Sequence, residues 1–153
     1  MNSILKKITA LSIYAVAMAL VEAAVVVYLR ELYYPLGFFI RSAADLEVIP
    51  LHILNVELWR EAATIFMLAA VSYLAFSAAK YRLLAFIFAF SLWDLAYYLF
   101  LYLFLRWPPG LMTLDVYFLI PWPWIGPVWL PLILFSFSAI TSFWFMLKTK
   151  NEQ

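Results

Sequence analysis

Long runs of apolar residues, separated by short polar stretches, follow one another along almost the whole chain. A helix needs about 20 consecutive apolar residues to cross the hydrocarbon core of a bilayer. Four runs reach that length, and each ends at a charged residue or a proline pair. We expect four transmembrane helices, at about residues 8–29, 57–79, 83–105 and 127–147.

The pattern predicts an all-α fold, a polytopic integral membrane protein whose four helices form an antiparallel bundle. The whole chain, 1–153, is short enough to form a single transmembrane domain. The turn near residues 80–82 is very short, so the second and third helices must be antiparallel neighbours. The two long connections, 30–56 and 106–126, are too apolar to float in water. We expect them to lie at the membrane interface on the outer side, where tryptophan and tyrosine are favoured, or to cap the bundle.

Composition supports the bilayer as solvent and removes several kinds of chemistry. Hydrophobic residues make up 68% of the chain and charged residues 12%, whereas soluble domains have roughly half and a quarter. The chain has no cysteine, which excludes disulfides, thiolate nucleophiles and iron–sulfur ligation. Its single histidine, His52 in the first long connection, argues against histidine-based metal centres. A net charge of +1 gives no support to a nucleic-acid partner. We expect no cofactor and no metal.

Lysine and arginine are distributed unevenly between the two sides of the predicted bundle. Positive residues favour the cytoplasmic side of a membrane protein. One side would carry six of them, and the other three, with a fourth at the membrane edge. The six are Lys6, Lys7, Lys80, Arg82, Lys148 and Lys150. We expect a protein of the cell membrane with both termini in the cytoplasm.

Charged residues inside the apolar runs are the candidate functional residues. A charge at the centre of a bilayer costs about 2.5–3.5 kcal/mol on insertion scales, so such groups should face the interior of the bundle. Residues three and four apart share one face of a helix. Glu57, Arg60 and Glu61 therefore form one stripe at the start of the second span.

Two further acids, Glu22 and Asp94, lie within the first and third spans. Tyr97 and Tyr98 follow Asp94 by three and four residues, on the same helix face. Small residues recur every fourth position in both spans and should let the two helices approach closely. They are Ala15, Ala19 and Ala23 in the first span, and Ala85 and Ala89 in the third.

We expect these side chains to converge in the outer half of the bundle as a binding or structural polar cluster. Its members are Glu22, Glu57, Arg60, Glu61, Asp94, Tyr97 and Tyr98. If Glu22, Arg60, Glu61 and Asp94 were all ionised, they would carry two net negative charges, so at least one acid should be protonated or bind a cation. Asp115, in the second long connection, is a candidate partner of Glu57 in a carboxylate-only cation site. A purely structural ion-pair clamp remains the alternative explanation.

Three functions are compatible with this pattern. The first is a small multi-pass membrane protein whose polar site binds or translocates a proton, a cation or an amphipathic small molecule. The second is a non-catalytic accessory or assembly subunit of a larger membrane complex. The third, ranked last because the chain offers no nucleophile, is an enzyme acting on a lipid or isoprenoid. The expected partners are the lipid bilayer and either further copies of the chain or a membrane complex.

Overall fold

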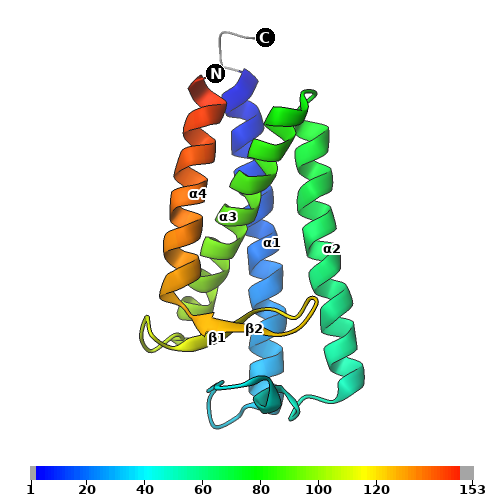
Figure 1. Cartoon of the computed structure of the whole chain (residues 1–153), viewed down its shortest axis with the longest axis vertical. Helices are drawn as coiled ribbons and strands as arrows, with labels where there is room; N and C mark the ends of the chain where they lie inside the picture. Colours follow the sequence, from blue (N-terminus) through cyan, green and yellow to red (C-terminus); the bar gives the residue numbers. More distant parts are fainter. Residues whose placement is uncertain (1–2, 149–153) are drawn as a thin grey trace.

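The computed structural model describes residues 3–148, and Figure 1 shows four long helices in this part, lying side by side. The elements are α1 (Ser3–Tyr33), the 3-10 helix η1 (Ala43–Leu46), α2 (Leu51–Ala75), α3 (Ala79–Leu105), β1 (Leu114–Phe118), β2 (Trp124–Pro127) and α4 (Trp129–Lys148). The end where α1 begins and α4 ends is called the termini end, and the opposite end the hairpin end. The prediction of four helices long and apolar enough to cross a membrane is confirmed.

Several helix boundaries differ from the prediction, most of all those of α2 and the start of α3. α2 begins at Leu51 rather than near residue 57, so His52 lies in its first turn and not in a loop. The carbonyl of Pro50 accepts the first hydrogen bonds of this helix, and proline is tolerated there because first-turn N–H groups need no helical partner. α2 ends at Ala75 and α3 begins at Ala79, which places Arg82 in the first turns of α3 rather than in a turn. The Nε atom of Arg82 donates to the carbonyl of Phe76 at 2.8 Å and so helps to close the end of α2.

α3 is the central helix, because it packs against each of the other three, whereas α1 and α2 touch each other much less. The small-residue stripes lie in its contact with α1 as expected. Ala15, Ala19, Ala23, Ala85 and Ala89 are all completely buried. Since no side chain extends beyond Cβ at these positions, the two helices can pack closely along most of their length.

A two-stranded antiparallel hairpin crosses the hairpin end, so the all-α prediction is wrong for this segment (Figure 1). Its strands are rich in valine, isoleucine and aromatic residues, which favour extended backbone. Asp115 pairs with Gly126 in the register. A side chain at Gly126 would collide with Tyr117, whose hydroxyl donates to the carbonyl of Pro127 at 2.6 Å. The hairpin is therefore an ordered cap over the ends of the helices, which is one of the two expected arrangements of this connection.

The connection between α1 and α2 folds over the same end. Its apolar side chains Ile40, Leu46 and Ile49 are buried. The carboxylate of Asp45 accepts hydrogen bonds from the backbone N–H groups of Arg41 and Ser42, each 2.8 Å long. These hydrogen bonds, that of Arg41 first, lower the pKa of Asp45 below its ordinary value. The result is an ordered second layer beside the hairpin.

Candidate functional site

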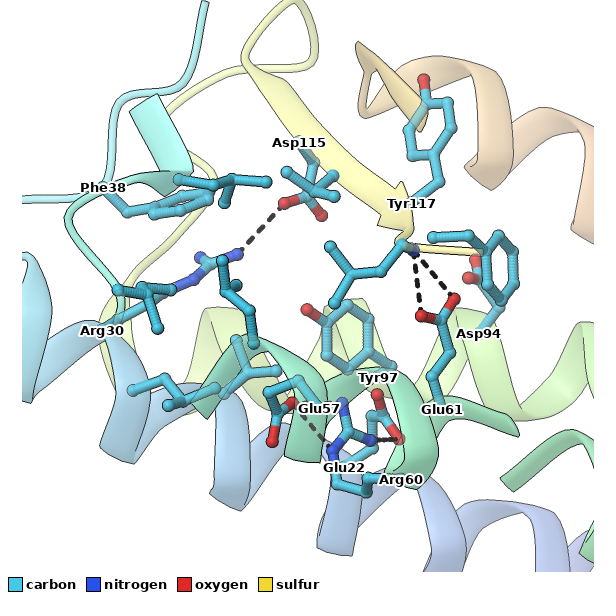
Figure 2. A pocket seen from close by; sticks show the side chains of 18 of the residues that line it. Glu22, Arg30, Phe38, Glu57, Arg60, Glu61, Asp94, Tyr97, Asp115 and Tyr117 are labelled. Atoms are coloured by element: carbon cyan, nitrogen blue, oxygen red, sulfur yellow. Dashed lines mark hydrogen bonds and ion pairs between the residues drawn. The ribbon is translucent and has the colours of Figure 1, made fainter. Parts of the chain in front are cut away.

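A cavity lies at the hairpin end between α1, α2 and α3, and β1 runs across it (Figure 2). Its volume is about 120 Å³, which is enough for several water molecules, because one water needs about 10–15 Å³ on this scale. The walls are mostly apolar but include seven charged side chains. These are Glu22 and Arg30 of α1, Glu57, Arg60 and Glu61 of α2, Asp94 of α3 and Asp115 of β1.

Arg60 connects two of the acids. Its Nε and Nη2 atoms donate to Oε2 of Glu57 at 2.9 and 2.7 Å, and its Nη1 atom forms an ion pair with Glu22. The hydroxyl of Thr64, one turn deeper in α2, lies 3.4 Å from the same Glu22 carboxylate. Glu22 and Glu57 are both buried, and Arg60 is half-buried. The predicted stripe on α2 therefore contacts α1, because Arg60 and Thr64 both reach the carboxylate of Glu22.

Glu61 joins α2 to the hairpin instead. Both of its carboxylate oxygens accept the backbone N–H of Leu119, at 2.9 and 3.1 Å (Figure 2). Leu119 belongs to the connection between β1 and β2, which has no other hydrogen bond to α2 within residues 3–148. The position of this connection over the cavity thus depends on a single carboxylate.

Asp94 differs from the other acids because no part of the chain that the structure describes donates a hydrogen bond to it. Its side chain lines the cavity and is about nine-tenths buried, and its Oδ2 atom is sealed from solvent without any partner. A buried carboxylate without a donor is costly, because it has lost its hydration and gained nothing in return. Asp94 is therefore the group of this cavity that most needs a ligand or a proton.

Arg30 and Asp115 form a second ion pair that the sequence did not predict. Nη2 of Arg30 donates to Oδ1 of Asp115 at 3.1 Å, and the hydroxyl of Tyr98 donates to Oδ2 at 3.0 Å. The guanidinium lies between two aromatic rings, 4.0 Å from the centroid of Phe38 and 3.9 Å from that of Trp107. Burial raises the pKa of Asp115, and the Arg30 guanidinium and the Tyr98 hydroxyl oppose that rise.

The predicted pairing of Asp115 with Glu57 in a cation site is wrong, because Asp115 is committed to Arg30. Nor do any three carboxylate or histidine side chains within residues 3–148 come together in a way that could hold a metal ion. One feature of the sequence could have indicated a buried partner for Asp115, namely its position in the strand-like segment "LDVYF". There, an acid on the inward face of a strand must find a buried partner.

All seven residues of the expected polar cluster line this one cavity. They are Glu22, Glu57, Arg60, Glu61, Asp94, Tyr97 and Tyr98. Sequence reasoning missed Arg30, its pairing with Asp115 and the hairpin that completes the enclosure. Together the charged groups amount to five carboxylates and two guanidinium ions, a formal excess of three negative charges. Unless some of these acids are protonated, the formal excess is balanced only by bound positive charge, so the cavity favours protons or cations.

Comparisons of the chain with protein-family models, with curated proteins and with solved structures find no match. The fold and the site define a helical protein with four potential membrane spans and an acidic cavity at the end away from its termini.

Proposed function

We propose that this chain is a multi-pass membrane protein that binds a monovalent cation in the acidic cavity at its hairpin end. Large apolar side chains on the outward faces of the helices support the membrane setting. Leu74 is 82% exposed and Phe66 is 74% exposed, and similar residues continue along α4. Contiguous apolar surface of this kind is rare on soluble monomers, and a bilayer would cover it.

The placement of charged and aromatic side chains supports the cytoplasmic assignment of the termini end. Lys7, Arg82 and Lys148 lie there, each over an aromatic ring, as expected for cations whose apolar stems cross the headgroup region. Lys150, which also entered the expectation, lies outside the described residues. At the hairpin end Trp122 and Trp124 are exposed, where an interfacial aromatic belt would lie. The cavity would then face the outer side of the cell membrane.

The observation that carries the proposal is Asp94, a buried carboxylate without a donor in a cavity with excess negative charge. A cation bound beside Asp94 would replace the hydration that burial removed and reduce the repulsion among the five acids. The presence of the cavity also favours this function over that of an assembly subunit, because closed ion pairs alone would serve subunit packing.

Binding is favoured over conduction. Between the cavity and the termini end the helices enclose tightly packed apolar side chains, and Ala19, Leu68 and Ala89 there are completely buried. A second apolar cluster, which includes Leu11, Phe76 and Phe88, fills the region nearer the termini end. An ion crossing this half would lose its hydration and meet no buried charged side chain of the described residues, only hydroxyls such as those of Ser72, Ser91 and Ser142, which is costly. The cation is therefore expected to enter and leave from the hairpin end.

Calorimetric titration of the full chain in nanodiscs of zwitterionic lipid tests the proposal. The probes are the chlorides of sodium, potassium, ammonium and tetramethylammonium, added to wild type, Asp94→Asn and Glu47→Gln. Glu47 is an exposed acid on the same side of the protein and away from the cavity, so its variant is the matched control. At least one cation should bind wild type and Glu47→Gln alike, and at least tenfold more weakly to Asp94→Asn. Equal affinity for Asp94→Asn, or no binding of any probe to wild type, would overturn the proposal.

A further inference from the structure

We propose that the cation is a small methylated ammonium ion, held with its charge at Asp94 and its alkyl groups against the aromatic walls of the cavity. This inference rests on the proposed function and names the ligand class of the same site. It follows from three properties of the cavity: the isolation of one carboxylate, the aromatic lining and the volume.

The carboxylates are arranged for one point charge rather than for a coordinated ion. Arg60 engages Glu22 and Glu57, the hairpin backbone engages Glu61, and Arg30 engages Asp115. Asp94 is left as the acid without a donor from residues 3–148. Inorganic cations require several oxygen ligands to replace their hydration shell, as the carbonyl rings of potassium filters and the 6–8 oxygens around calcium illustrate. An ammonium ion with alkyl substituents needs only one counter-charge, because its own hydration is weak.

Aromatic side chains line the same cavity as that carboxylate. Trp93, Tyr97, Tyr117 and Phe118 all line the cavity together with Asp94. Figure 2 shows Tyr97 lying between the Arg30–Asp115 pair and Glu61. The faces of such rings attract organic cations within about 6 Å of the ring centre, and quaternary ammonium groups are recognised in this way. A hydrated inorganic ion would gain less from the same walls, which are mainly apolar.

The volume is of the order that a small organic ion requires. A dry cavity of about 150 Å³ accommodates benzene. At about 120 Å³ this cavity is somewhat smaller, and it is partly open rather than fully enclosed. Tetramethylammonium, which carries its charge at the centre of four methyl groups, is a probe of this scale. Longer polyamines or lipid-sized amines would extend part of their chain out of the cavity.

The test compares the affinities of four probes for the wild-type protein in nanodiscs. Tetramethylammonium is titrated against sodium, potassium and tert-butanol, a neutral molecule of the same number of non-hydrogen atoms. We expect tetramethylammonium to bind at least tenfold more tightly than each of the other three. If sodium or potassium binds as well as tetramethylammonium, this inference fails while cation binding as such survives. If tert-butanol binds equally well, the cavity recognises shape alone and the inference is likewise wrong.

Two variants of Tyr97 test the aromatic wall. Tetramethylammonium donates no hydrogen bond, so Tyr97→Phe should leave its affinity within twofold of wild type. Tyr97→Leu removes the ring and should weaken tetramethylammonium at least fivefold, while the midpoint of thermal unfolding reports whether the fold persists. An unchanged affinity in Tyr97→Leu would contradict the role given to this ring. If that variant does not fold, the comparison of the four probes on wild type still decides the inference.

Discussion

The ion pair between Arg30 and Asp115 gives the sharpest quantitative prediction. Asp115→Ala removes the carboxylate and leaves the Arg30 guanidinium buried without a counter-ion. The two side chains are only 7% and 2% exposed, so solvent would screen the remaining charge poorly. Breaking a buried pair by removing one partner costs about 3–5 kcal/mol. The two aromatic rings beside Arg30 remain in the variant and still attract its guanidinium. The loss of stability should therefore lie in the lower part of that range.

The free energy of unfolding, measured by titrating the detergent-solubilised protein with sodium dodecyl sulfate, provides the assay. Arg106→Met is the matched control, because the Arg106 side chain is exposed and its guanidinium lies 5.7 Å from the Tyr102 ring without an ion pair to any described residue. It should change stability by less than about 0.5 kcal/mol, as surface substitutions usually do. The double variant Arg30→Met with Asp115→Leu should recover much of the loss, since apolar replacements of buried pairs are often neutral. The reasoning is refuted if Asp115→Ala costs under about 1 kcal/mol, or if the double variant loses as much as the two single changes added together.

Three further predictions concern packing, the hairpin and pH. Ala89→Leu should destabilise the fold by about 1–3 kcal/mol, because the α1–α3 contact has no room for a larger side chain, whereas the exposed Ala10→Leu should be nearly neutral in the same titration. Glu61→Leu should speed hydrogen exchange at the Leu119 amide at least tenfold, and Glu61→Gln, which keeps an acceptor, should do so much less. Equal rates in all three forms would contradict the anchoring role. Because the folded pKa of Asp45 is lowered, its contribution should be complete above its ordinary value of 3.8 and disappear as the pH falls through the lower folded value. The protection factors of the amides from which it accepts hydrogen bonds should fall in that acid window and stay constant above it.

The helices were predictable because their signal is local and strong. A run of about 20 apolar residues has few alternatives to a spanning helix. The ends were less predictable, since a helix continues as long as its backbone hydrogen bonds are satisfied, whatever the polarity of its side chains. α1 therefore starts at Ser3, before its apolar run, and α2 starts directly after Pro50. The hairpin was missed because prolines and tryptophans in its connection resemble an interfacial loop.

The candidate site was predictable to the extent that it obeys helix periodicity. Glu57 and Arg60 are three residues apart, and their ion pair follows from that spacing. Glu22 was added by the argument that charges in an apolar segment must meet one another, and Arg60 does contact it. Arg30 and Asp115 are 85 residues apart, and their meeting depends on the register of a hairpin that no helical period encodes. Long-range contacts between different kinds of element lie outside such pattern reasoning.

The distribution of partners among the acids bears on whether the cluster is a clamp or a binding site. Arg60 with Glu22 and Glu57 has the geometry of a clamp, because both carboxylates contact the same guanidinium and so join α1 to α2. Stability alone does not require even this arrangement, since buried pairs can often be replaced by apolar residues without loss. Asp94 contributes to no such pair within the described residues and adds a negative charge to an already acidic cavity. A group that lowers the stability of the empty protein is explained most economically by a ligand whose positive charge removes the penalty when it binds.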